Sequence, residues 1–385
     1  MANIKKLKEN TVKLVKLEDV CYNGSSSLSQ KDIIMLDGKY PVYGASGLIK
    51  YINFYKYDKE YIAIVKDGAG IGRTMILPAN SSVISTLQYI FPKENINIRY
   101  LYYALNAMDL SKYYSGVTIP HIYFKDYKKE ELYLPIIDEQ INIVNKLDKI
   151  REIIDIRKKQ IEELDEIIKS QFVEMFGDPI LNPMKWKVKK LGELSNKVMS
   201  GNTPKGGDRV YVSSGIEFYR SQNVWKNKIE KDDIAYIDEE THKKMLKSSL
   251  KHNDLLITKT GRINTENSSL GRTALYVGED DKANINGHVY LVRLNKGENH
   301  EFILRILISD EYREYIRSVC VGGIDKRQLN KEHIENFPII YPPIELQNQF
   351  ADIVKQIDKQ KFEIQKSLEE MQNLQESLMN KYFGG

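Results

Sequence analysis

Two loops combine a lysine with a later Gly-Arg-Thr sequence, which suits contact with a nucleic acid. In the first, an apolar run at 61–65 leads into Lys66 and then into Gly-Arg-Thr at 72–74. In the second, Lys259 leads into Gly-Arg-Thr at 271–273 through a loop six residues longer. Glycine lets a backbone approach a ligand closely, lysine and arginine bind phosphates, and arginine also pairs with a guanine edge. Because the two loops differ in length but follow equivalent β-like runs, they favour two different targets. The alternative is a pair of tight β-hairpins with incidental cations.

Other polar residues near expected turns extend this set. The stretch 219–223 contains Arg, Gln and Asn, the side chains best suited to base edges. The segments 121–125 and 326–328 lie at equivalent distances before two proline-containing segments. For each of these stretches, an exposed turn without function is an equally good interpretation. The candidate DNA-contacting residues are Tyr43, Ser46, Lys66, Gly70, Arg73, His121, Lys125, Lys205, Arg220, Gln222, Asn223, Lys259, Thr260, Arg262, Arg272, His288, Lys326 and Arg327.

The sequence lacks the motifs of common nucleotide-dependent and hydrolytic enzymes. It has no Gly-x-x-x-x-Gly-Lys-Ser/Thr loop, and the glycines of 67–72 have the wrong spacing for a dinucleotide-binding loop. It also has no Asp/Asn-Pro-Pro-Tyr/Phe tetrad of an amino-methyltransferase. The six histidines show no metal-ligand spacing, and no Ser/His/Asp or Cys/His arrangement can be argued. We therefore expect this chain to carry no catalytic residue, metal site or cofactor.

Composition limits the class of protein further. Among 385 residues, 57 Lys and Arg oppose 53 Asp and Glu, so a net charge of +4 excludes a polybasic tail but not a local basic surface. The two cysteines, Cys21 and Cys320, fit neither a zinc site nor a disulfide framework and favour a reducing compartment. Because no apolar stretch of about 18 residues exists, we expect no membrane span and a cytoplasmic protein. The length suggests two or three domains.

The chain contains an internal repeat. Ten residues recur at a constant separation of 207 positions, without a gap, over some forty residues. Such regularity indicates two copies of one unit. The recurring residues are Pro135, Ile137, Gln140, Ile150, Lys159, Glu162, Glu163, Ser170, Phe176 and Gly177, matched by Pro342, Ile344, Gln347, Ile357, Lys366, Glu369, Glu370, Ser377, Phe383 and Gly384.

Both copies of the repeat have the apolar spacing of a long helix. Steps of three and four residues give a period near 3.5, which is typical of a coiled coil, so we expect the two helices to pack on each other. The alternative is two long surface helices, each lying on its own domain. Gly177 followed by Pro179 predicts the end of the first helix. The predicted seam consists of Ile143, Leu147, Ile150, Ile154, Ile161, Leu164 and Ile168 in the first helix and Phe350, Val354, Ile357, Ile364, Leu368 and Met371 in the second.

The segments before the helices contain short β-like runs at 61–65, 254–258 and 288–292, separated by Gly, Asn and Asp turns. They read as mixed α/β globules. The predicted fold class is α+β, with two such globules in tandem, each followed by a long helix, and the two helices pairing as an antiparallel coiled coil.

In combination, these features resemble a known family, the specificity (S) subunits of type I restriction–modification systems. The resemblance covers nearly the whole chain. It rests on 176–179, 182–183, 186–194 and 200–204, on both Gly-Arg-Thr loops and on the two proline–glutamine helix starts. The first helix start departs from the family's double proline, which the second keeps at 342–343.

The resemblance implies a role for each part of the chain. Residues 1–135 would form target-recognition domain 1 and 178–341 target-recognition domain 2, each reading one half of a bipartite site in double-stranded DNA. Residues 136–177 and 342–385 would form the central and C-terminal coiled-coil helices. These helices would dock two methyltransferase (M) subunits and fix the unread spacer between the half-sites.

The resemblance also assigns the chemistry to partner subunits. S-adenosylmethionine, ATP and Mg would belong to them, with adenine methylated after base flipping and DNA cleaved by a nuclease/translocase (R) subunit where one is present. Two alternatives stay open. One is a non-catalytic protein-interaction scaffold without DNA specificity, and the other is a lone nuclease or methyltransferase with an unrecognised site.

Overall fold

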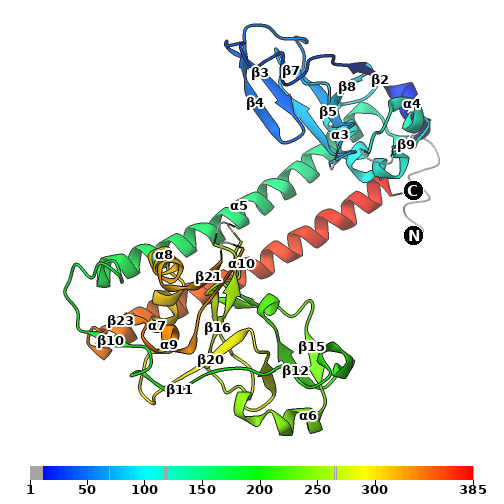
Figure 1. The fold of residues 1–385 in the computed structure, drawn as a ribbon. Helices are drawn as coiled ribbons and strands as arrows, with labels where there is room; N and C mark the ends of the chain where they lie inside the picture. Colours follow the sequence, from blue (N-terminus) through cyan, green and yellow to red (C-terminus); the bar gives the residue numbers. More distant parts are fainter. Residues whose placement is uncertain are drawn as a thin grey trace. The chain divides into compact units, whose positions relative to one another are not determined.

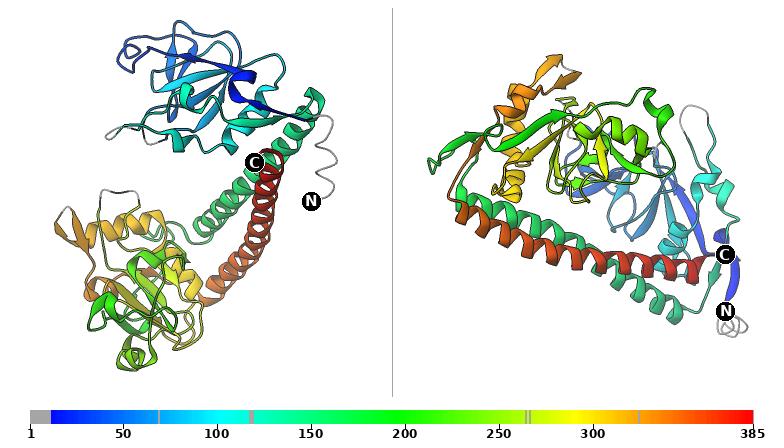
Figure 2. Two further views of the ribbon diagram at one scale, coloured as in Figure 1. Left: turned by 90° about the vertical axis from the view of Figure 1, so that its right-hand side faces the viewer. Right: turned by 90° about the horizontal axis from the view of Figure 1, so that it is seen from below.

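The computed structural model describes residues 12–68, 70–116, 120–263, 265, 267–323 and 325–384. The chain divides into two compact units, Met1–Ile161 with Glu363–Gly385, and Glu162–Phe362. Each unit holds one globular module and part of each of two long helices, α5 (Ile137–Phe176) and α10 (Ile344–Phe383) (Figures 1 and 2). We call the residues before α5 module 1 and those between α5 and α10 module 2.

Module 1 is built on small β-sheets. Its strands are β1 (Lys13–Lys16), β2 (Cys21–Ser25), β3 (Tyr40–Gly44), β4 (Gly47–Ile52), β5 (Tyr61–Val65), β6 (Thr74–Leu77), β7 (Ser82–Val83), β8 (Leu87–Pro92) and β9 (Glu131–Leu134). A four-stranded sheet has the order β2-β8-β5-β6, a three-stranded sheet has the order β4-β3-β7, and β1 pairs with β9. Strands β3 and β7 run parallel, whereas the other pairs are antiparallel.

Module 2 repeats this topology. Its strands are β10 (Val188–Lys190), β11 (Ser195–Ser200), β12 (Ile216–Tyr219), β13 (Val224–Trp225), β14 (Lys228–Ile229), β15 (Ala235–Ile237), β16 (Leu255–Thr258), β17 (Thr260–Gly261), β18 (Thr273–Leu275), β19 (Ala283–Ile285), β20 (Val289–Leu294), β21 (Val321–Gly323), β22 (Lys326–Gln328) and β23 (Pro338–Ile340). The orders β11-β20-β16-β18, β15-β12-β19 and β10-β23 match the three sheets of module 1, including one parallel pair, β12 with β19. The modules are therefore copies of one fold, although the gap-free sequence repeat is confined to the helices.

Short helices complete both modules. Module 1 has α2 (Leu17–Val20), α3 (Ile98–Ala107), η1 (Leu110–Tyr113) and α4 (Phe124–Tyr127). Module 2 has η2 (Gly207–Val210), η3 (Ser221–Asn223), α6 (Glu239–Lys244), η4 (Leu246–Ser248), α7 (His300–Leu307), α8 (Asp310–Val319) and α9 (Lys331–Glu335). Asparagine side chains cap equivalent helices, because Asn97 accepts from the backbone N–H groups of Arg99 and Tyr100 at the start of α3, and Asn299 accepts from Phe302 N–H in α7.

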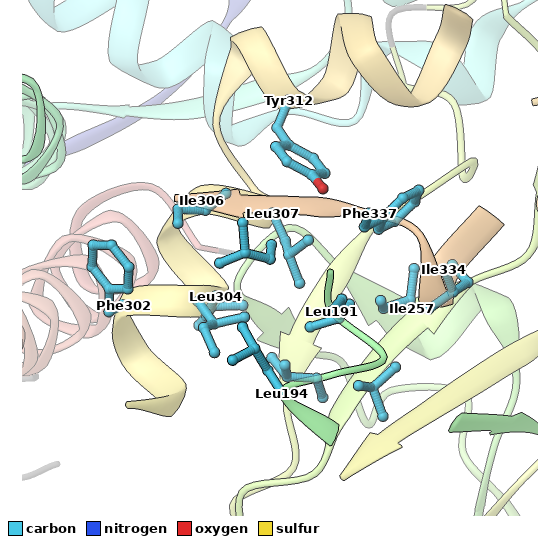
Figure 3. Close-up of a cluster of buried hydrophobic side chains, with 14 of the residues drawn as sticks. Leu191, Leu194, Ile257, Phe302, Leu304, Ile306, Leu307, Tyr312, Ile334 and Phe337 are labelled. Atoms are coloured by element: carbon cyan, nitrogen blue, oxygen red, sulfur yellow. The ribbon is translucent and has the colours of Figure 1, made fainter. Parts of the chain in front are cut away.

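Central strands form where the sequence is continuously apolar. All five residues of β5 and all four of β16 are buried, as expected for strands covered on both faces. The predicted strands at 61–65, 254–258 and 288–292 are confirmed by β5, β16 and β20. The core of module 2 joins β16 and β20 to apolar side chains of α7, α8 and α9, including Phe302, Tyr312 and Ile334 (Figure 3).

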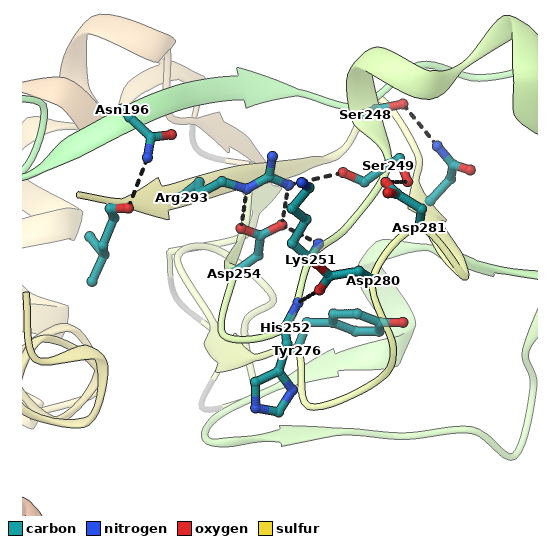
Figure 4. A network of polar contacts seen from close by, with 12 residues as sticks. Asn196, Ser248, Ser249, Lys251, His252, Asp254, Tyr276, Asp280, Asp281 and Arg293 are labelled. Atoms are coloured by element: carbon teal, nitrogen blue, oxygen red, sulfur yellow. Dashed lines mark hydrogen bonds and ion pairs between the residues drawn. The ribbon is translucent and has the colours of Figure 1, made fainter. Parts of the chain in front are cut away.

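A buried ion pair fixes two neighbouring strands of module 2. Asp254 precedes β16 and accepts two hydrogen bonds from the guanidinium of Arg293 on β20 (Figure 4). Its carboxylate also accepts from the backbone N–H of Lys251, at 2.6 Å. A buried charge needs such partners to offset the loss of hydration.

Each long helix is fastened to its module by a buried glutamine. Gln140 donates to the carbonyl oxygens of Pro135 and Asn95 and accepts from the N–H of Asn97. Gln347, at the equivalent position of α10, donates to the carbonyl oxygen of Pro342. Both glutamines are 0% exposed. The shared proline–glutamine pattern is therefore a joint between helix and module.

Helix α5 ends where the sequence predicts. Gly177 has a φ of +75°, which favours glycine, and a Cβ there would lie 2.7 Å from Pro183. The carboxylate of Asp178 then accepts from the N–H groups of Ile180 and Leu181, and Trp186 Nε1 donates to the carbonyl of Phe176. These contacts explain the Phe-Gly-Asp-Pro sequence and the tryptophan that follows it.

In the first unit, the predicted seam packs on both the module and the other helix. Ile143 and Leu147 belong to the buried cluster of α3, and Leu378, Met379, Tyr382 and Phe383 of α10 pack against the same cluster. A second cluster is formed by Ile150, Ile154 and Leu368, with Ile161, Met371 and Leu378 packed on it. The start of α5 thus lies in the core of its own module, and residues of α10 pack against the same cluster.

In the second unit, the remaining seam residues join the core of module 2. Ile168, Phe172 and Phe176 of α5 share a buried cluster with Phe350, Val354 and Ile357 of α10, and Leu164 packs against it. Ile364 is half-buried and lies in the first unit.

Within the part of the chain that the structure describes, no helix combines the length and the apolar character that a membrane span requires.

Candidate nucleic-acid interface

The loop after β5 is held by backbone hydrogen bonds, four of which have counterparts in module 2. Lys66 N–H donates to Thr86 O at 3.0 Å, and Ile122 N–H donates to Lys66 O at 2.9 Å. Val65 N–H donates to Arg73 O and Gly72 N–H to Val65 O, both at 2.9 Å. The loop 66–73 therefore lies against two other segments of module 1, one entering β8 and one ending at Ile122.

The loop after β16 is held by the same four bonds. Lys259 N–H donates to His288 O at 2.8 Å, and Leu329 N–H donates to Lys259 O at 2.9 Å. Thr258 takes part in the remaining two bonds, since Thr258 N–H donates to Arg272 O and Gly271 N–H donates to Thr258 O. The pairing of lysine with Gly-Arg-Thr thus marks one structural position in each module.

Different side chains occupy this shared position. In module 1, His121 Nδ1 lies 2.6 Å from Asp67 Oδ1, and Lys66 Nζ lies 4.0 Å from the other oxygen of Asp67. Lys125 is exposed, with its ammonium 5.3 Å from the centre of the Tyr123 ring. Module 1 therefore presents an acid–histidine pair beside two lysines.

Module 2 places a β-hairpin at this position. Thr260 pairs with Gln328 and Gly261 with Arg327, where β17 meets β22 of the β21–β22 hairpin. The hairpin stands out from the rest of the module in both views of Figure 2. Arg262 and Lys326 are exposed and line a depression of about 430 Å³. The acid–histidine pair of module 1 thus corresponds to the uncharged pair Thr260 and Gln328.

His288 lies beside the second loop, and exposed Lys205 follows a glycine that contacts the segment before His288. A Cβ on Gly201 would be 2.1 Å from Ile285 O, so only glycine allows the segment that carries Lys205 to approach the turn before β20. His288 is exposed in that turn and its N–H donates to Asn286 Oδ1. His288 and the Lys259 loop therefore lie side by side in module 2.

The arginines of both Gly-Arg-Thr sequences brace loops. Arg73 donates to the carbonyl of Ala45, which ties the loop of Gly70 to the β3–β4 turn carrying Ser46 and, within β3, half-buried Tyr43. Arg272 donates to the carbonyls of Ser268 and Asn267, and its guanidinium lies 3.7 Å from the centre of the Trp225 ring. Burial lowers the pKa of the Arg272 guanidinium. Both arginines thus hold the backbone of neighbouring loop segments in place. The sequence predicted a contact with phosphate and not this bracing role.

The Arg-Gln-Asn stretch of module 2 is mostly engaged within its own loop. Arg220 pairs with Asp233, and Gln222 Nε2 donates to the same carboxylate at 3.0 Å. Asn223 is buried, accepts from Arg220 N–H and donates to the carbonyls of Glu230 and Asp233. The base contact of Asn223 stays a prediction, and the structure shows both N–H groups of its amide used inside the loop.

Three functional neighbours were missed from sequence. Asp67 pairs with His121 across 54 positions, Trp225 supports Arg272, and Asp233 holds Arg220. Only Asp67 carried a signal, because it directly follows the singled-out Lys66. Within the described ranges, no group of three or more His, Cys, Asp or Glu side chains is placed to hold a metal ion.

The fold defines a protein of two like modules, each carrying one exposed loop surface and each joined to a long helix. The sequence profile described as the type I restriction modification DNA specificity domain matches residues 9–166 and 183–372. The chain therefore belongs to the type I restriction modification DNA specificity domain family, and the two matches fall on the two modules with their helices.

Individual relatives agree with this family. The type I restriction enzyme MjaIX specificity subunit of Methanocaldococcus jannaschii is 26% identical over 319 residues, which cover 77% of this chain and 70% of that protein. The EcoBI specificity subunit of Escherichia coli is 23% identical over 327 residues, covering 76% and 66%.

Solved structures show the same fold. The S subunit of a type I restriction–modification system from M. genitalium has a TM-score of 0.62 at 18% identity, covering 98% of this chain and 97% of that one. A chain from work on complex assembly and conformational transition of the type I R-M system has a TM-score of 0.54 at 16% identity, covering 98% of both chains.

Proposed function

We propose that this chain is the DNA-recognition subunit of a type I restriction–modification enzyme and reads a bipartite site with its two modules. The carrying observation is the shared loop position, held by the same four backbone hydrogen bonds but presenting His121 and Asp67 in one module and Gln328 and Thr260 in the other. One scaffold with two sets of side chains suits two different half-sites. Membership of the family supports the same conclusion.

Within each module, side chains divide between two kinds of DNA contact. Exposed cations reach phosphates without reading sequence, and these are Lys125, Lys205, Arg262 and Lys326. Side chains with both donors and acceptors read base edges, and we assign this role to His121, Thr260 and His288. Arg73, Arg272 and Arg220 brace loops of the two modules.

The two long helices pair antiparallel and set the distance between the modules. The contacts inside the two units support this arrangement. The residues of α5 between 143 and 161 pack with α10 beyond 363, whereas those after 164 pack with α10 before 358. This reversed order is what antiparallel pairing requires. A fixed separation of the modules would make the spacer between half-sites a geometric property of the helices.

Methyltransferase subunits dock on the outer faces of these helices. Large apolar side chains are exposed there, including Ile156, Ile167, Val173 and, at 67% exposure, Phe362. Such exposure on a protein surface indicates an interaction site. In this proposal the chain itself is non-catalytic, and the partner subunits bind S-adenosylmethionine, ATP and Mg.

The test is methylation mapping of DNA from cells that express this chain with methyltransferase subunits. We expect methylated adenines within one bipartite sequence that disappears when the chain is omitted, and binding of the assembly to that sequence that weakens with salt. Exchange of segment 186–340 for that of a relative is expected to change one half-site and leave the other unchanged. Methylation that does not depend on the chain, or assembly without sequence-selective binding, would favour the scaffold alternative.

A further inference from the structure

We infer that Lys361 and Asp165 select the pairing partner of each long helix, so that α5 pairs with α10 of the same chain and not with α5 of a second copy. This inference rests on the proposed helix pairing and adds the reason why each long helix pairs with the other helix of its own chain. Because the two helices are repeats of each other, each of them is a potential partner for its own counterpart in another molecule. Some feature must distinguish them.

The distinguishing ion pair lies inside the second unit. Lys361 Nζ is 2.6 Å from Asp165 Oδ1, and the two side chains are 22% and 45% exposed. Lys361 occupies a seam step, four residues after Ile357 and three before Ile364. Asp165 flanks the seam of α5, directly after Leu164. Charges that flank an apolar seam are known to set partner choice in paired helices.

The repeat offset shows what stands at the equivalent positions. Lys361 corresponds to Ile154, and Asp165 corresponds to Gln372, both 207 positions away. In the first unit, Ile154 is buried in one cluster with Leu368, where a charged side chain would be unfavourable. Lys361 of α10 thus pairs with a carboxylate of α5. Ile154, at the equivalent position of α5, packs with the uncharged Leu368 of α10.

Pairing of two identical helices would break this match. Two copies of α10 would set Lys361 against Leu368 and Gln372, so an amide would replace the carboxylate of the 2.6 Å ion pair. Two copies of α5 would set Asp165 against Ile154, so an apolar side chain would replace the lysine of that pair.

The test moves the carboxylate from one helix to the other. In the double variant Asp165→Gln with Gln372→Asp, the carboxylate that replaces the Asp165 partner of Lys361 lies on α10 of a second chain. We expect self-association at least tenfold tighter than in the control, weakened by added salt, measured as molar mass against concentration by light scattering and sedimentation. The matched control is Asp155→Gln with Gln372→Asp, which keeps Asp165 and the same net charge. Asp155 is exposed on α5.

In both double variants the new carboxylate stands at position 372. Its surroundings are therefore the same in the two variants, and they include Arg151, which lines one pocket with Gln372. Equal self-association of the two double variants would overturn the inference.

A disulfide variant separates this result from failure of the helix pairing itself. Ile154→Cys with Leu368→Cys is expected to close a cross-link within one chain, because the two residues belong to one buried cluster. If it closes while the carboxylate transfer has no effect, the pairing stands and the selection by Lys361 and Asp165 falls. If no such cross-link closes, the pairing and the inference that rests on it both fall.

Discussion

Arg293 holds Asp254 with two parallel hydrogen bonds, Nε to Oδ1 at 2.8 Å and a terminal nitrogen to Oδ2 at 2.7 Å. The carboxylate is 1% exposed, so its charge depends on this partner. Replacing Arg293 by methionine would leave the charge buried and unpaired. We expect the free energy of unfolding to fall by about 3 kcal/mol. Both tryptophans, Trp186 and Trp225, lie in the second unit, so urea unfolding followed by tryptophan fluorescence reports on it.

The control for that variant is Arg317→Met on α8. Arg317 pairs with Glu314 in an exposed i,i+3 pair, whose loss is expected to change the free energy of unfolding by less than about 0.5 kcal/mol. Equal effects of the two substitutions would show that the Arg293 pair has no special weight.

The second unit is expected to lose stability in mild acid through His300. Burial lowers the pKa of this imidazole, so the unfolded chain binds the proton more readily than the folded one. The stabilisation is therefore complete above the unfolded pKa of about 6.5 and declines as the pH falls below it. In urea unfolding at pH 7.5 and 5.5, the drop is expected to be smaller for His300→Gln than for the native chain. An identical drop would assign the acid sensitivity to carboxylates instead.

Arg272 is expected to matter for sequence discrimination more than for affinity. Alanine at this position removes the brace to Ser268 and Asn267 and the contact with Trp225. We expect about 1 kcal/mol less discrimination in one half-site, against the 1–3 kcal/mol that a mismatched base pair usually costs. Lysine is not expected to restore it, because it lacks the planar fork. Methylation maps check this, and Arg73→Ala is the matched variant that should relax the other half-site.

Lys326 is expected to act on phosphate alone. Its replacement by alanine should weaken binding to all sequences and reduce the slope of log K against log salt by about 0.9, the value for one lost phosphate contact. Lys247→Ala is a suitable control, because this lysine is exposed on η4, outside the loops of the interface. An unchanged slope for Lys326→Ala would exclude the contact.

The spacer between half-sites is expected to follow helix length. Seven residues inserted after Gln160, with a matching insertion after Ser367, lengthen each helix by about 10.5 Å, near three base pairs of B-DNA. Methylation mapping should show two unchanged half-sites and a longer gap. Seven residues inserted after Gly297 in an open turn of module 2 should leave the gap unchanged. A constant gap with lengthened helices would contradict the proposed spacing role.

Local pattern and repetition were enough to predict the long helices, the central strands and the loops at Lys66 and Lys259. Each depends on neighbours in sequence or on a constant offset, so the signal lies within one segment. The bracing role of Arg272 and the burial of Asn223 depend on partners from other turns, such as Trp225 and Asp233, whose approach only the folded chain defines. The shared topology of the modules was equally hidden, because unequal loops interrupt any gap-free alignment between them.

The glutamine joints have a consequence for how such chains diversify. Every hydrogen bond of Gln140 and Gln347 that fastens a helix to its module ends on a backbone atom. These hydrogen bonds depend on the backbone path of the module and not on its side chains, so a foreign module with the same path needs only apolar side chains that pack on the start of the helix. Recombination at these two joints would thus supply new combinations of DNA-reading modules and leave the two long helices unchanged.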